Sequence, residues 1–220
     1  MNGMRAAENV IFLSKQDASF AEDADLQLHS LVVPPLFDYR PSSRRHTSGA
    51  NGIVEIGFVG NFNWWPNREG LRWFLTEVLP RITSDTRLHL FGEGTNGVNP
   101  PHPRVITHGF MPSTEDIWSQ CDFMICPIHA GGGVNVKLAE TIYNGVPALT
   151  TSFGARGLPL SDDPGIVVLN SAEEWIAFLN SQSARALGSR RALESNAGEF
   201  AMQAHAERVR SYIQEVIRTH

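Results

Sequence analysis

From residue 53 onward, short continuous runs of hydrophobic residues alternate with stripes in which hydrophobic residues recur every three or four positions. The runs are typical of buried strands, and the stripes are typical of helices with one buried face. The predicted strands are Ile53–Gly60, Arg87–Phe91, Val105–Ile106, Asp122–Ile128, Val146–Thr151 and Gly165–Leu169. Helices are predicted to begin at Pro66, Ser113, Val134 and Ser171, and a closing helix is predicted from about Asn196 to Arg218.

This alternation predicts an α/β fold, a Rossmann-like doubly wound parallel sheet covered by helices on both faces. Ligands of such sheets bind at the carboxyl ends of the strands. Before it, residues 1–38 contain two further apolar runs, at Asn9–Ser14 and Leu31–Pro35, with a short helix between them. Two short strands do not form a stable sheet alone, so this segment is interpreted as the remnant of a second domain.

The predicted domain organisation has three parts. Residues 1–38 are the remnant, residues 39–52 are a linker rich in Ser, Arg, Pro and Gly, and residues 53–220 form the sheet domain including the closing helix.

A glycine-rich turn joins the strand ending near Ile128 to the helix predicted from Val134 to Gly145. Such a turn directs backbone N–H groups at an anion, and the helix dipole adds about half a positive charge. Lys137 and Glu140 are three residues apart and project from one face of that helix. The pattern predicts a diphosphate on Gly131–Gly133, neutralised by Lys137, with Glu140 binding a sugar hydroxyl.

Two alternatives stand beside this interpretation: a turn that serves only tight packing, and a solvated pair of Lys137 and Glu140. Lys15 and Lys137 are the two lysines among eighteen basic residues. In a chain that otherwise uses arginine, the choice of lysine at position 137 indicates that a compact point charge is required there, and such a charge suits a phosphate ligand.

Composition excludes some classes of function. The net charge of −5, without a run of basic residues, argues against a nucleic-acid binder. No apolar run approaches the roughly 20 residues of a transmembrane helix. Without a leader-like opening, the expected location is the cytoplasm, with Cys121 and Cys126 as reduced, buried thiols on opposite faces of a strand.

Other motifs carry less weight. Residues 92–97 match a dinucleotide-binding fingerprint, but the prolines that follow cannot begin the required helix. His102 and His108 lack partners at zinc-ligand spacing and are interpreted as structural. The loop Asn61–Asn67 either lines a ligand cleft or is packed by its own aromatic residues.

Four blocks of the sequence together resemble the nucleotide-binding, C-terminal half of group 1 (family 4) glycosyltransferases, retaining enzymes of the GT-B fold. The blocks are Phe58–Phe62 with Pro66-Asn67 and Glu77–Pro80; Leu90–Gly94; His108–Met111; and Gly131–Glu140 with Asn144–Pro147 and Thr151–Leu158. The last block is the most specific.

The resemblance implies transfer of a sugar from a nucleoside-diphosphate sugar, with retention and without a metal or other cofactor. It implies catalytic roles for Lys137, at the diphosphate, and Glu140, at the ribose hydroxyls. The other donor-binding residues that it implies are Gly60, Asn61, Phe110, Gly131, Gly132, Gly133 and Val134.

Two features depart from the family pattern. Many members carry a second carboxylate at the position of Gly132, although a glycine-rich subset does not. The acceptor domain is represented only by residues 9–35. Either an acceptor-domain polypeptide pairs with this segment, as an expected partner, or the chain is truncated and that domain is lost. The alternative function is a non-catalytic, partner-dependent nucleotide-binding module. A nicotinamide-dependent oxidoreductase would rest on residues 92–97 alone.

Overall fold

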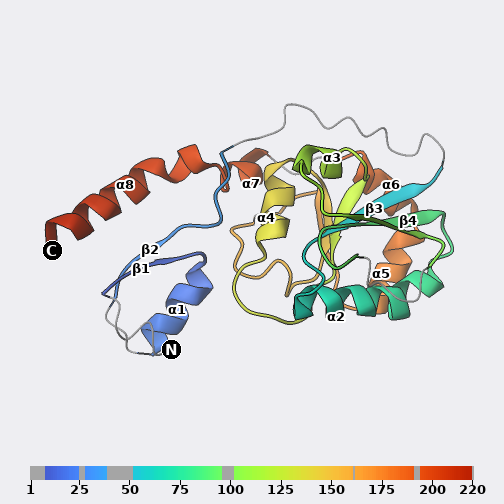
Figure 1. Cartoon of the computed structure of the whole chain (residues 1–220), viewed down its shortest axis with the longest axis horizontal. Helices are drawn as coiled ribbons and strands as arrows, with labels where there is room; N and C mark the ends of the chain where they lie inside the picture. Colours follow the sequence, from blue (N-terminus) through green and yellow to red (C-terminus); the bar gives the residue numbers. More distant parts are fainter. Residues whose placement is uncertain are drawn as a thin grey trace.

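The computed structural model of the chain describes residues 8–24, 28–38, 52–95, 102–160, 162–190 and 194–219. A larger body is built on one sheet, and a smaller N-terminal unit lies beside the last helix (Figure 1). The predicted linker, apart from Gly52, and residues 96 and 97 of the fingerprint segment lie outside the described residues.

The larger body contains six parallel strands in the order β5-β4-β3-β6-β7-β8. Their bounds are β3 Val54–Val59, β4 Thr86–Phe91, β5 Val105–Gly109, β6 Phe123–Cys126, β7 Ala148–Thr150 and β8 Ile166–Val168. This order confirms the predicted doubly wound parallel sheet. The direction of strand succession reverses between β3 and β6, the point at which such sheets open a crevice for a ligand.

Helices cover both faces of the sheet (Figure 1). They are α2 Trp65–Trp73, α3 Thr114–Trp118, α4 Val136–Tyr143, α5 Ala172–Leu179, α6 Gln182–Gly188 and α7 Glu194–Gly198. α2, α5 and α6 contribute to the largest core cluster, on one face, and α3, α4 and α7 pack on the other. At the centre of the first face Trp175 is fully buried, and its Nε1 donates to the Leu169 carbonyl at 2.9 Å.

Two predicted helix boundaries need correction. The helix expected from Val134 begins at Val136, because the chain is still turning at Gly133, where φ is +67°. Its predicted end is confirmed, since Gly145 follows the C-cap with φ +68°. The single closing helix is instead two: α7, and α8 Met202–Thr219, separated by a turn.

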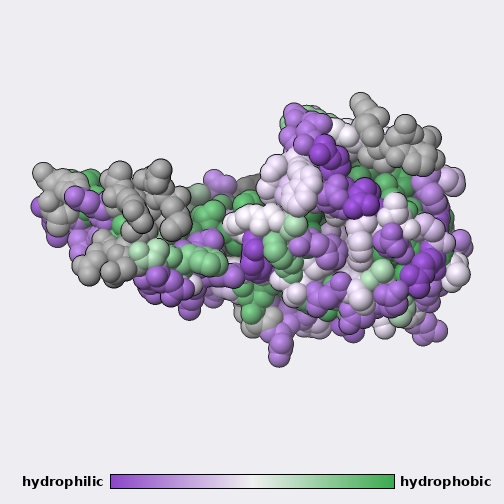
Figure 2. Space-filling view, turned by 90° about the horizontal axis from the view of Figure 1, so that it is seen from below, coloured by the Kyte–Doolittle hydropathy of each residue, from purple (hydrophilic) through white to green (hydrophobic). Residues whose placement is uncertain are grey.

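The N-terminal unit is a β-α-β arrangement. β1 Asn9–Phe12 and β2 His29–Val32 are parallel, and α1 Lys15–Asp23 connects them. Its small core contains Phe12, Ala18 and Ala21. A narrow waist joins this end of the molecule to the larger body, with hydrophobic residues along it (Figure 2).

The last helix packs against this unit. The Tyr212 hydroxyl donates to the His29 carbonyl at 2.6 Å, and Arg208 donates to the Val32 carbonyl at 3.1 Å. The assignment of α8 to the 53–220 domain stays a prediction, and these contacts link α8 to the first 38 residues.

Cysteine and histidine positions agree with the structural interpretation. Cys121 and Cys126 are free, buried thiols in separate core clusters, as predicted. His108 lies 2.8 Å from His89, which lies 2.9 Å from Glu55, so it belongs to a hydrogen-bonded chain across β3, β4 and β5. In the described part of the chain, no helix is long and apolar enough to span a membrane.

Candidate functional site

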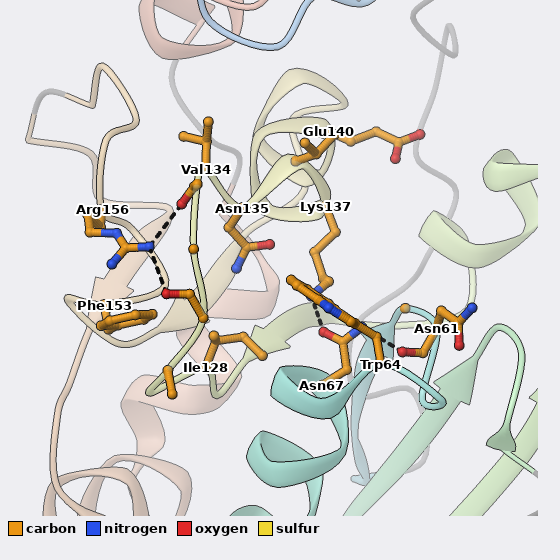
Figure 3. A pocket seen from close by; sticks show the side chains of 16 residues that line it. Asn61, Trp64, Asn67, Ile128, Val134, Asn135, Lys137, Glu140, Phe153 and Arg156 are labelled. Carbon is orange, nitrogen blue, oxygen red and sulfur yellow. Dashed lines mark hydrogen bonds between the residues drawn. The ribbon is translucent and has the colours of Figure 1, made fainter. Parts of the chain in front are cut away.

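A pocket of about 610 Å³ opens where the sheet order reverses, at the carboxyl ends of β3 and β6 (Figure 3). Its volume is within the range of about 300–1,000 Å³ that is usual for small-molecule sites. The lining residues are Gly60, Asn61, Trp64, Asn67, Ile128, Ala130–Val136, Lys137, Glu140, Phe153 and Arg156.

The Lys137 ammonium is held in place within this pocket. Its Nζ donates to Oδ1 of Asn67, a side chain that is only 2% exposed, and Asn67 Nδ2 donates to the Asn61 carbonyl at 2.8 Å. Burial lowers the pKa of Lys137, and the nearby Cys126 opposes this shift. The ammonium is therefore partly desolvated and poorly compensated, which increases its attraction to an anionic ligand.

Gly60 makes room for this arrangement. A Cβ at this position would lie 2.8 Å from Asn67 Nδ2 and 3.4 Å from Lys137 Cε. A larger residue would therefore displace the pair of side chains that forms the floor of the pocket. This steric requirement explains the glycine at the end of β3.

Glu140 lies one helical turn beyond Lys137 and lines the same pocket. Lys137 Nζ donates to Asn67 rather than to this carboxylate, so the simple Lys137–Glu140 pair weighed from the sequence is not formed. Burial raises the pKa of Glu140. A partly buried carboxylate on the pocket wall can accept hydrogen bonds from ligand hydroxyls.

The glycine loop is braced by Arg156. One guanidinium nitrogen donates to the Gly133 carbonyl at 3.0 Å and lies 3.5 Å from the Gly131 carbonyl, while the group stacks 4.1 Å above the Phe153 ring. In a trans peptide the C=O and the following N–H point in opposite directions. The N–H groups of Gly132 and Val134 therefore point away from Arg156.

Figure 3 places Arg156 and Phe153 on one side of the loop and Lys137 with Asn67 on the other. The two amides thus face the side on which the ammonium lies. The start of α4 adds to this positive environment, because the Asn135 side chain donates to Cys126 Sγ at 2.6 Å and does not cap the helix.

Most of the residues predicted from the sequence meet in this pocket. Those that line it are Gly60, Asn61, Gly131, Gly132, Gly133, Val134, Lys137 and Glu140. Phe110 does not: it follows β5, two strands away from β3, and is 72% exposed. Its predicted contact with a nucleobase, and the individual roles of the other residues, stay predictions.

Sequence reasoning did not single out Asn67, Trp64 or Arg156. The loop from Asn61 to Asn67 was recognised as a candidate cleft wall, but only the fold shows that Asn67 turns inward to meet a helix 70 residues later. Arg156 lies in the most specific block of the resemblance. No local pattern indicated its contact with the glycine carbonyls.

Among the residues that the structure describes, no group of three or more His, Cys, Asp or Glu side chains is placed to hold a metal ion. The cationic side chains that line the pocket are Lys137 and Arg156. The expectation that no metal is needed stays a prediction.

A doubly wound parallel sheet with a pocket at its switch point defines the chain as a Rossmann-like α/β domain. Residues 54–181, more than half of the chain, match the family described as glycosyl transferases group 1. The chain belongs to this family.

Comparison with curated proteins gives a 28% identical match over 127 residues to an uncharacterized 44.6 kDa protein in the cps region of Klebsiella pneumoniae. It covers 51% of this chain and 33% of that protein.

Three similar solved structures are longer than this chain. HepE from Anabaena, crystallised with UDP and glucose, has a TM-score of 0.71 at 17% identity, over 95% of this chain and 64% of HepE. TarM gives a TM-score of 0.69 at 12% identity, over 96% of this chain and 45% of TarM. Sucrose-phosphate synthase from Thermosynechococcus elongatus gives a TM-score of 0.69 at 14% identity, over 96% of this chain and 59% of the synthase. These likenesses establish that the chain has the fold of a Rossmann-like domain of GT-B glycosyltransferases, and the chain spans less than two thirds of each protein.

We predict that diphosphate affinity passes through a maximum with pH. Burial raises the pKa of Glu140, so as pH falls its carboxylate takes up a proton at a higher pH than an ordinary glutamate does. The protonated group accepts weaker hydrogen bonds from the ligand hydroxyls. As pH rises, Lys137 loses its charge below the ordinary lysine range, because its pKa is lowered. Calorimetric titration with a nucleoside diphosphate between acid and alkaline pH measures both limbs.

Glu140→Gln is the control for the acid limb. The second ionisation of the ligand's terminal phosphate has a pKa of about 6, and its effect on affinity is common to the unmodified chain and to Glu140→Gln. The additional loss of affinity at low pH should disappear in the variant. An identical acid limb in the two proteins would contradict the role of Glu140.

A second prediction concerns Arg156. Arg156→Met should weaken diphosphate binding about three- to tenfold, because the glycine loop loses the hydrogen bond that orients its amides. Arg72→Met, which removes an exposed guanidinium paired with Glu69 on α2, is the matched control and should leave affinity unchanged. If Arg156→Met has no effect in calorimetry, the bracing role is wrong.

Proposed function

We propose that this chain is the donor-binding part of a glycosyltransferase that uses a nucleoside-diphosphate sugar and transfers the sugar with retention. The observation that carries the proposal is the fixed, partly desolvated Lys137 ammonium opposite the amides of Gly132 and Val134. Membership of the glycosyl transferases group 1 family supports it. HepE, which has the same fold, was crystallised with UDP-glucose.

The chemistry follows from the charges of the pocket. Transfer breaks the bond between the anomeric carbon and the phosphate oxygen, and the electron pair of that bond stays on the departing nucleoside diphosphate. Negative charge therefore develops on the phosphate, next to Lys137 and the two loop amides. Donors that are already oriented stabilise this charge without reorganisation, so in this proposal no metal ion is required.

Glu140 has the second role in the proposal. Its carboxylate accepts hydrogen bonds from the ribose hydroxyls and fixes the position of the nucleoside relative to Lys137. The base would then extend from the pocket toward the carboxyl ends of β4 and β5, where Phe110 follows β5.

With its two thiols reduced, the protein is proposed to act in the cytoplasm.

The test of donor binding is calorimetry with UDP, GDP and ADP. Lys137→Ala should weaken binding of the preferred diphosphate about ten- to hundredfold, because a charge-assisted hydrogen bond contributes about 1.5–3 kcal/mol. Lys15→Ala is the matched control: it removes the other lysine, which is exposed on α1, and should change nothing. Failure of all three diphosphates to bind the unmodified chain would reject the proposal.

The structure of the N-terminal unit favours pairing with another polypeptide that carries the acceptor domain. Within the described residues its sheet has two strands, a number that is marginal for stability in isolation. Large apolar side chains remain exposed around it, at Ile11, Leu13 and Phe20. We propose that residues 9–35 pair with an acceptor-domain polypeptide, which completes this sheet and supplies the acceptor pocket.

Donor binding and transfer should therefore separate. The chain alone is expected to bind its nucleotide but to release no nucleoside diphosphate from a nucleotide sugar above the spontaneous rate, because in this proposal the partner polypeptide supplies the acceptor pocket. A coupled assay for diphosphate release measures this. Rapid release by the isolated chain would contradict the need for a partner. Binding without activity in any complex would favour the alternative, a non-catalytic nucleotide-binding module.

A further inference from the structure

Two neighbouring tryptophans at the start of α2 are exposed to a similar extent but lie in different surroundings. Trp64 is 53% exposed and Trp65 is 50% exposed. Trp64 lines the pocket, whereas Trp65 is not among the lining residues. The Trp64 side chain thus lies in the pocket beside Lys137 and is partly accessible to a ligand (Figure 3).

The backbone of Trp64 is fixed at both ends of the residue. Its N–H donates to the Asn61 carbonyl at 3.2 Å, and its carbonyl accepts from the Arg68 N–H at 3.2 Å as the helix begins. A tryptophan on a fixed backbone has two side-chain torsions left to order, so it offers a large contact area at a low entropic cost. In the part of the chain that the structure describes, no aromatic ring stacks on the Trp64 indole.

The space beside Trp64 is bounded on its other side by the glycine loop. The loop approaches the start of α2 closely, since a Cβ at Gly131 would lie 3.2 Å from Cγ of Pro66. One residue later the space opens, and a Cβ at Gly132 would meet no atom within 4 Å. The loop therefore contacts the start of α2 at Gly131 and faces open space at Gly132, in the pocket that Trp64 also lines.

The chemistry of the indole selects among the parts of a donor. The face of an aromatic ring carries partial negative charge, so it does not favour the diphosphate, which the ammonium and the loop amides attract. The ribose belongs near Glu140. A neutral pyranose ring bonded to the diphosphate has apolar C–H faces and polar edges, so one face can lie on the indole while hydroxyls reach the glycine loop.

We propose that Trp64 is the platform on which the sugar ring of the donor stacks, and that it makes the pocket prefer the nucleotide sugar over the free nucleoside diphosphate. This inference rests on the proposed function. It assigns the sugar to the wall formed by the loop after β3. Once the sugar has been transferred, the diphosphate loses this contact and leaves a weaker complex, which favours product release.

The experiment compares Trp64→Ala with its matched control, Trp65→Ala. Calorimetry first identifies the diphosphate that binds best among UDP, GDP and ADP, which tests the proposed function independently. The glucose, galactose and N-acetylglucosamine derivatives of that diphosphate are then titrated into the unmodified chain and both variants. Circular dichroism of each variant verifies that it is folded.

Trp64→Ala should weaken binding of the best nucleotide sugar about three- to tenfold and leave diphosphate binding within about twofold of the unmodified chain. Trp65→Ala should change neither, and Trp64→Phe should recover part of the loss. The inference is overturned if Trp64→Ala weakens the diphosphate and the nucleotide sugar equally, or if it weakens neither. If the unmodified chain binds none of these nucleotides, the proposed function is rejected instead.

Discussion

The hydrogen bond between the Lys137 ammonium and the buried Asn67 amide is the constraint on which the site depends. It joins the first turn of α4 to the first turns of α2, and these helices follow the two strands at which the sheet order reverses. A flexible lysine alone would place its charge loosely and be strongly hydrated. Here the fold removes part of that hydration and fixes the direction of the charge, while Gly60 keeps the adjoining space free of a side chain.

The glycine loop completes the site through contacts on its opposite side. Arg156 donates to the carbonyls of Gly131 and Gly133, and this hydrogen bonding orients the N–H groups of Gly132 and Val134 without placing the guanidinium on the Lys137 side of the loop. The stack on Phe153 restricts the arginine itself. The pocket therefore combines one charged side chain with dipoles of the main chain, and both are set by residues outside the glycine segment.

Much of the fold could be predicted because buried strands and amphipathic helices have distinct periodicities, and a strand that is followed by glycines and a helix implies a ligand edge. Lys137 and Glu140 were found for the same reason, since helical spacing places them on one face. Asn67 and Arg156 could not be found in this way, because their partners lie 70 and 23 residues away and are reached through the tertiary fold. The sequence pattern predicts the start of α4 two residues too early, because the hydrophobicity of Val134 does not indicate the left-handed turn at Gly133.

The contact of Tyr212 with His29 has a consequence for biosynthesis. The two residues are 183 positions apart, and the same hydroxyl lies 3.3 Å from the Val10 carbonyl, 202 positions away. A chain that emerges from the ribosome presents the β1-α1-β2 segment well before α8, whereas domains usually fold in the order of synthesis. The β1-α1-β2 segment therefore lacks its contacts with α8 until about 180 further residues have been synthesised, and during that interval its apolar surface is open to chaperones or to the strand of another polypeptide.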